Sequence, residues 1–254
     1  MSGMYSWKNF CDKFRRYGRL NTKEVIGLIF TILVIAFIFS FREWGIGNFD
    51  LDLGISNLVL AIILTTITML ARVYAQKISA LLIGYKVEYK HWTLGLVVCL
   101  VLAFVSNGYL RLFAVGGILF HHLQIHRLGR YRYSPENSTF GWIATSGTAA
   151  NIFLAIISKA LHLISGSEFF YKLMLLNIWI AIFSLIPIPP LDGVRLFFGS
   201  KNIYFFTIVT VVATGLLLKT TTYSLGGLIL GTLVGAAFLF VFFFVIEKNW
   251  QKFK

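Results

Sequence analysis

The sequence is poor in cysteine, proline and charge. Its 254 residues include 2 cysteines and 4 prolines, and 13% of them are charged. Cys11 lies in a basic segment and Cys99 in an apolar run, so no disulfide is expected, and neither has a metal-ligating partner at short spacing. The charged fraction is about half that of soluble domains, which excludes an ordinary soluble fold.

Apolar residues dominate what remains. Hydrophobic side chains make up 57% of the chain, and its mean hydropathy is +0.78. These values are typical of a multi-pass membrane protein, and the length suits one compact helical unit. We therefore expect an all-α membrane protein in which residues 24–254 form a single polytopic domain of about six transmembrane helices. The lipid bilayer is its first expected partner.

Several apolar runs are long enough to cross the bilayer, and one is interrupted. The expected spans are 25–41, a second that begins near 55 and runs past 70, 140–163, 169–186, 203–218 and 225–246. The interrupted run, 92–114, contains Asn107, Gly108 and Arg111 and has basic residues at both ends. A re-entrant hairpin or a pair of short helices would keep both ends on one side of the membrane. Residues 83–90 partly alternate in polarity, which predicts a short strand beside the membrane.

The net charge of +13 lies in the segments between the apolar runs. This is the distribution of the positive-inside rule, so it does not indicate nucleic-acid binding. It predicts a protein integral to the cell membrane with both termini in the cytoplasm. Segment 1–23 mixes basic and aromatic side chains, which suits a helix lying on an anionic membrane surface. A disordered anchor that only sets orientation is an equal alternative for this segment.

Three stretches carry a family resemblance. An Asp-Gly pair follows a proline-broken helix in SLIPIPPLDG, residues 184–193. The small-residue stretch SGTAAN occupies 146–151, and AQKISALLIGYKVEYKHW occupies 75–92. In their order along the chain (75–92, 146–151, 184–193), over residues 55–200, they resemble the site-2 protease family of intramembrane zinc metalloproteases, in its archaeal type. In that family the aspartate of the last motif is the third zinc ligand, and proline is common where this chain has Thr148.

The resemblance also implies an H-E-x-x-H motif, in which two histidines bind zinc and the glutamate is the general base. Aligned on the stretch 75–92, those positions hold Arg72, Val73 and Gln76. Arginine has no lone pair for a metal, and valine cannot accept a proton. Ser184 stands where the family has an asparagine, so no catalytic position is intact. Asp192 is the only zinc ligand kept, and we expect neither a bound zinc nor another cofactor.

Arg72 and Asp192 are the charged residues of this degenerate site. If the helices pack as in the family, the guanidinium binds the carboxylate in place of the metal, because a paired charge costs less in a bilayer than two separate charges. Gln76 and Ser184 would then satisfy the remaining hydrogen-bonding atoms. In the alternative, Arg72 points to the cytoplasmic interface and Asp192 is capped or hydrated alone.

A second set of residues corresponds to the family's substrate path. It comprises Gly147, Asn151, Pro187, Pro189 and Gly193. Small residues also let helices approach closely, so tight packing with one satisfied amide explains the stretch 146–151 equally well. The resemblance and the lost ligands together predict a catalytically inactive relative, a pseudoprotease, which binds a transmembrane helix of a partner protein without cutting it.

Two other functions stay open. His121, His122 and His126 could supply displaced zinc ligands in an active protease, although the arginines beside them oppose a cation and favour lipid headgroups. Arg72, Asp192 and the broken helix could also line the path of a small transporter or channel. Internal repeats are usual in such folds, and the chain shows no paired halves.

Overall fold

The computed structural model describes residues 7–45, 49–122 and 137–220, and the further positions 233, 234 and 237. The helices are α1 (Trp7–Tyr17), α2 (Thr22–Ser40), α3 (Leu51–Ile83), α4 (Thr93–Val105), α5 (Asn137–Ser165), α6 (Glu168–Ser184), α7 (Asp192–Gly199) and α8 (Lys201–Thr220). Within these residues, strands β1 (Tyr85–Lys90) and β2 (Gly117–His122) pair with each other. The described part of the chain is therefore mostly helical.

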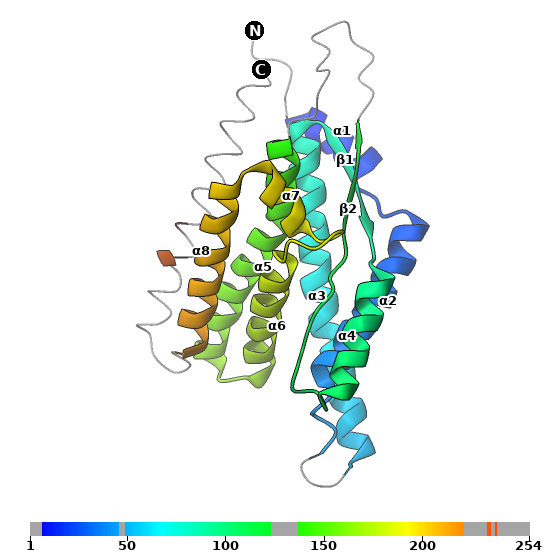
Figure 1. Cartoon of the computed structure of the whole chain (residues 1–254), viewed down its shortest axis with the longest axis vertical. Helices are drawn as coiled ribbons and strands as arrows, with labels where there is room; N and C mark the ends of the chain where they lie inside the picture. Colours follow the sequence, from blue (N-terminus) through cyan, green and yellow to red (C-terminus); the bar gives the residue numbers. More distant parts are fainter. Residues whose placement is uncertain (1–6, 46–48, 123–136, 221–232, 235–236, 238–254) are drawn as a thin grey trace, which may run out of the picture.

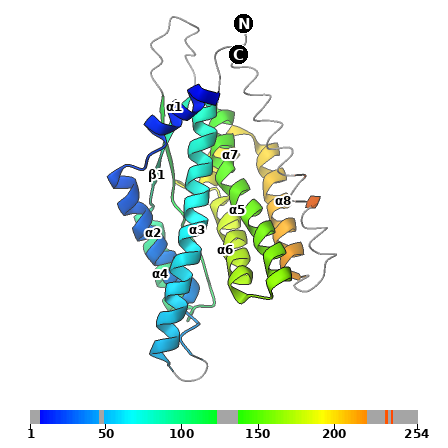
Figure 2. The same ribbon diagram turned by 180° about the vertical axis from the view of Figure 1, so that it is seen from behind.

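Helix α3 lies at the centre of the molecule (Figures 1 and 2). Helices α2 and α4 lie on one side of it, and α5, α6, α7 and α8 lie on the other. One cluster of buried apolar side chains joins α2, α3, α4 and α6, and includes Ile35 and Met69. A second cluster joins α5, α6, α7 and α8 through residues such as Ile152 and Leu196. The predicted site lies where α3 meets this second group.

Within the residues that the structure describes, α2, α3 and α5 are long and apolar enough to cross a membrane. Exposed aliphatic side chains such as Ile26, Leu33 and Ile63 lie on α2 and α3. Helices α4 and α8 are apolar over shorter stretches, and α6 has 17 residues. The helices are those of a membrane protein, but the six predicted spans are not confirmed. The last of them, 225–246, lies largely outside the described residues.

Both ends of α3 are fixed by local chemistry. At its start the Asp50 side chain accepts hydrogen bonds from the backbone N–H of Asp52 at 3.0 Å and of Leu53 at 3.2 Å. At its end Gly84 has a φ of 97°, and its N–H donates to the carbonyl of Ala80 at 2.9 Å. Glycine is favoured there because a side chain strains that backbone conformation. The chain passes from this cap directly into β1.

The segment between the strands leaves the sheet and comes back to it. Its outgoing part is α4, and its returning part is non-helical backbone that runs up to β2 (Figure 1). Asn107 and Gly108, with φ values of 50° and 74°, turn the chain just after α4. The antiparallel pairing of Lys90 with Gly117 brings both ends together. The strand predicted over 83–90 is present as β1, at 85–90. Of the two alternatives for 92–114, the segment has the out-and-back path of a hairpin and not a pair of short helices. Strand β2 was not predicted.

A buried carboxylate, Glu24, ties the start of α2 to α3 and β1. It accepts hydrogen bonds from the backbone N–H of Tyr89 at 2.7 Å and of Asn21 at 2.8 Å. Lys77 of α3 completes the group, with Nζ 2.9 Å from Glu24 Oε1, and the two side chains are only 2% and 4% exposed. Buried ion pairs need such additional hydrogen bonds to offset the loss of hydration.

Glu24→Gln is expected to lower the free energy of unfolding by about 2–3 kcal/mol, because Lys77 keeps a buried charge that loses its charged acceptor. The matched control is Glu88→Gln, since Lys86 and Glu88 form a 2.7 Å pair that is 34% and 23% exposed. The control should lose less than about 1 kcal/mol, as partly solvated pairs do. Titration with SDS in mixed micelles measures both losses, and equal losses would contradict the special role of Glu24.

Candidate functional site

The candidate site lies where α3, α5 and α7 meet. Helix α3 supplies Arg72 and, one turn later, Gln76, while Asp192 is the first residue of α7. Arg72 and Asp192 are each 2% exposed, and Gln76 is 1% exposed. The site is therefore enclosed by protein although its two main side chains are ionisable.

One carboxylate oxygen of Asp192 accepts hydrogen bonds from two side chains of α3. Arg72 Nη2 donates to Asp192 Oδ2 in a buried ion pair. Gln76 Nε2 donates to the same oxygen at 2.7 Å and to the carbonyl of Ala144 at 3.1 Å. The amide group of Gln76 thus uses both of its hydrogens, one toward α7 and one toward α5. These contacts bring together residues 120 positions apart in the chain.

The close approach of α5 to α3 depends on Gly147. A Cβ atom built on Gly147 would lie 2.8 Å from Gln76 Nε2 and 2.9 Å from Arg72 Cγ. Both distances are far below the usual 3.5–4.0 Å of van der Waals contact. The absence of a side chain at this position lets Gln76 reach the α5 backbone.

Buried polar atoms around the pair retain hydrogen-bonding capacity. Among the described residues, Arg72 Nη1 and Asp192 Oδ1 have no hydrogen-bond partner. The same holds for both amide atoms of Asn151, which lies one turn beyond Gly147 on α5. Buried polar groups are rarely left unpaired in proteins.

Ser184 lies apart from the carboxylate. Its hydroxyl donates to the carbonyl of Ala181 at 2.8 Å and lies 3.1 Å from Thr148 Oγ1. The sequence-based hypothesis that Ser184 satisfies Asp192 is wrong, because a threonine hydroxyl on α5 is its neighbour. These contacts link α5 to α6 beside the site.

Val73 faces a different environment from Arg72 and Gln76. It is 1% exposed and belongs to the apolar cluster that joins α2, α3, α4 and α6. This position carries no polar atom in its side chain, so it cannot take a proton.

The residues assigned to the substrate path fall into two groups. Gly147, Asn151 and Gly193 are buried in the helix packing. A Cβ atom on Gly193 would collide with backbone carbonyls just after α6. Pro187 and Pro189 are exposed in the loop between α6 and α7. Of these five residues, only the two prolines of the loop have exposed side chains.

Arg195 is a contributor that the sequence analysis missed. It lies one turn into α7, and its Nη2 donates to the carbonyl of Ile118 in β2 at 2.6 Å. Its guanidinium also lies 4.6 Å from the ring centroid of Phe120. Arg195 therefore holds the short helix that begins at Asp192 against the sheet. The available signal was a basic residue one turn after the aspartate.

The donor set at this position does not fit the zinc ion that the resemblance implies. Zinc takes thiolate, imidazole and carboxylate ligands. Here the positions of the two histidines present N–H donors to Asp192, and arginine has no lone pair to offer. Among the described residues, no three His, Cys, Asp or Glu side chains gather in one place.

The predicted histidine cluster is described only in part. His121 Nε2 lies 3.4 Å from Glu88 Oε2, across the two-stranded sheet. A hydrogen bond from Lys86 holds the pKa of Glu88 below its usual range. The side chain of His122 and the whole of His126 lie outside the described residues.

Comparison with known proteins gives one distant relative. The chain is similar to a protein of Methanocaldococcus jannaschii named "Putative zinc metalloprotease MJ0611", with 26% identity over 180 residues. The matched region covers 69% of this chain and 83% of that protein. No family model and no solved structure matches the chain. The likeness supports a distant relationship to this protein, whose name describes it as a putative zinc metalloprotease.

Proposed function

We propose that the protein is a non-catalytic relative of the site-2 proteases, which binds a transmembrane segment of another membrane protein without cleaving it. The contact between Arg72 and Asp192 carries this proposal. It lies at the position where the family's zinc ligands would meet, and Gln76 donates to the same carboxylate oxygen. Val73 stands in place of the glutamate that serves as general base in the family, and its side chain cannot accept a proton.

Binding is proposed at the loop between α6 and α7 and on the adjoining face of α6. Ile188, between two exposed prolines, is 47% exposed, and Trp179 on α6 is 36% exposed. Trp179 stacks on Phe183, with ring centroids 5.7 Å apart, one turn before the loop. Van der Waals packing is a main source of association between transmembrane helices. This apolar surface, called the loop surface below, offers such packing next to the buried site.

We propose that the protein lies in the cell membrane with both termini in the cytoplasm, and the distribution of charge supports this orientation. Basic residues gather before α2 and after α3, whereas Asp50 and Asp52 lie at the other end of α3. Lysine and arginine favour the cytoplasmic side of a membrane. The degenerate site, near the basic end of α3, would then lie toward the cytoplasm.

A photo-crosslinking residue at Ile188 tests the binding half of the proposal. In intact cells it is expected to join the chain to a transmembrane segment of a second, full-length membrane protein. The matched control carries the same crosslinker at Phe153 on α5, which is 52% exposed. The control should give no such adduct, because at similar exposure it lies on another helix, outside the loop surface.

Two results would contradict the proposal. Equal adducts from Ile188 and Phe153, or none from Ile188, would exclude binding at the loop surface. Recovery of the Ile188 partner as a fragment cut within its span would exclude the non-catalytic half, and the chain would then have to be assayed as a protease.

A further inference from the structure

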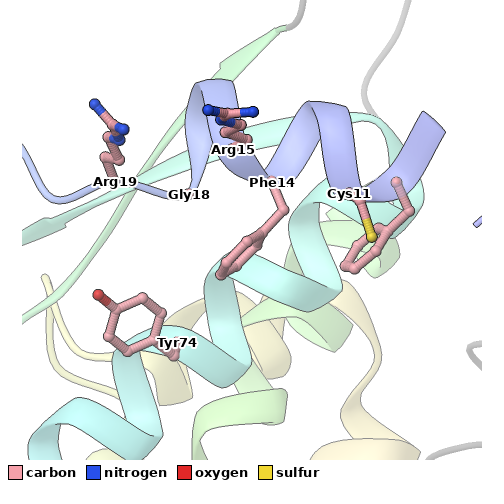
Figure 3. A pocket seen from close by; sticks show the side chains of 7 residues that line it. Cys11, Phe14, Arg15, Gly18, Arg19 and Tyr74 are labelled. Atoms are coloured by element: carbon pink, nitrogen blue, oxygen red, sulfur yellow. The ribbon is translucent and has the colours of Figure 1, made fainter. Parts of the chain in front are cut away.

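A pocket of about 490 Å³ lies between α1 and the C-terminal part of α3 (Figure 3). Phe10, Phe14 and Tyr74 line it with aromatic rings. The ring centroids of Phe10 and Phe14 are 6.2 Å apart, and those of Phe14 and Tyr74 are 6.5 Å apart. A space bounded by a row of aromatic rings is suited to an alkyl chain.

Two arginines stand at the rim of this pocket. Arg15 and Arg19 both line it and are exposed, and their guanidinium groups extend away from Tyr74 (Figure 3). Among the described residues neither of them pairs with a carboxylate. The acidic residue of the same helix, Asp12, pairs with Arg16 instead, at 3.3 Å. Two guanidinium groups without an acidic partner are a good binding site for a phosphate.

The rim is attached to the folded core. The backbone carbonyl of Arg19 accepts a hydrogen bond from Lys77 Nζ at 3.4 Å. Lys77 is itself held by the buried carboxylate of Glu24. The pocket therefore has one wall on α3 and a rim fixed to the same helix.

The pocket lies at the depth where lipid headgroups are expected. Helix α3 has 33 residues, and about 20 apolar residues are enough to cross the hydrocarbon core. Counted from Leu53, just after the acidic start of α3, such a span ends close to Tyr74. Tyrosine and arginine are both favoured at this boundary, where apolar chains meet charged headgroups.

We infer that this pocket binds one anionic phospholipid, whose phosphate lies on Arg15 and Arg19 and whose acyl chain lies along Phe10, Phe14 and Tyr74. This goes beyond the general attraction of a basic helix to a membrane, because it assigns one lipid to one position. It does not depend on the proposed function of the Arg72–Asp192 site.

Native mass spectrometry of the detergent-purified chain with added phosphatidylglycerol tests the assignment. One phosphatidylglycerol should bind at concentrations where phosphatidylcholine does not. Each arginine at a membrane surface is worth about fivefold in affinity, so Arg15→Gln/Arg19→Gln should bind about 25-fold more weakly. Arg16→Gln is the matched control, because it removes the same charge from the same helix but not from the pocket. It should change the affinity by less than about twofold.

Cys11 provides a second measurement inside the pocket. It lines the pocket and is exposed, whereas Cys99 is buried, so a polar maleimide should label Cys11 selectively. Phosphatidylglycerol should slow this labelling in the wild type and in Arg16→Gln, but not in the double variant. Equal weakening by Arg16→Gln would overturn the assignment in favour of diffuse charge attraction. Protection by inorganic phosphate alone, or labelling that is slow without any lipid, would overturn it as well.

Discussion

The Asp192→Asn variant is expected to lose about 3–5 kcal/mol of unfolding free energy, the cost of leaving a buried charge without its partner. Arg72 is 2% exposed, so its charge cannot be hydrated in the folded protein. Asparagine keeps the shape of the side chain and can still accept from Gln76 Nε2. The loss therefore reports the missing negative charge. It is measured by SDS titration of the purified protein in mixed micelles.

Removing both charges should recover most of this loss. In Arg72→Met/Asp192→Asn no buried charge remains, and a double-mutant cycle gives the coupling between the two positions. Glu43→Gln is the control, because Lys172 and Glu43 form a 2.7 Å pair that is 19% and 25% exposed. It should lose less than about 1 kcal/mol. Simple addition of the two single losses would contradict a direct interaction.

The apolar runs of the sequence predict the positions of several helices. They do not predict the contacts that buried polar side chains make between helices. The expected spans 25–41 and 140–163 correspond to α2 and α5, because long apolar runs predict helices in a bilayer. The span expected to begin near 55 and to run past 70 corresponds to α3, which ends at Ile83. The polar residues of α3 beyond 70 are buried with partners, Gln76 on Asp192 and Lys77 on Glu24, and these contacts cannot be seen within one helix.

Strand β2 could not be predicted from its own residues, because it depends on a partner strand far away in the sequence. A two-stranded sheet exists only through the register of two segments, here Tyr85 with His122 through Lys90 with Gly117. The alternation of β1 is visible in its own sequence, whereas residues 117–122 are mostly apolar and have no such pattern. Its place is decided by the turn after α4 and by contacts such as that of Arg195 with Ile118.

The candidate site could be predicted from the sequence only by combining the spacing of its residues with the family resemblance. Arg72 and Gln76 are four residues apart, so a helix places them on one face. Nothing in that spacing points to Asp192, and the resemblance supplied its pairing with Arg72. The hypothesis that Ser184 also satisfies atoms of the ion pair failed, because Thr148 has a hydroxyl where proline is common in the family, and this hydroxyl lies 3.1 Å from Ser184 Oγ.

A zinc site is expected to form in the variant Arg72→His/Gln76→His. Both replaced side chains reach Oδ2 of Asp192 from successive turns of α3, so imidazoles at these positions would be directed toward the same carboxylate. Two histidines at this spacing and one aspartate form a three-ligand set that leaves a coordination position open. We expect about one zinc per chain in the variant and none in the wild type, measured by elemental analysis after dialysis.

The matched control adds Asp192→Ala to the same double variant, which should lose the zinc because the third ligand is gone. Val73 is kept unchanged, because it is 1% exposed in an apolar cluster and a carboxylate there would be buried without a partner. Metal binding is thereby tested apart from catalysis. A folded double-histidine variant that binds no zinc would show that the family's motif is not aligned on positions 72 and 76. In that case the ion pair is an independent feature of this chain, and its position no longer argues for descent from a protease.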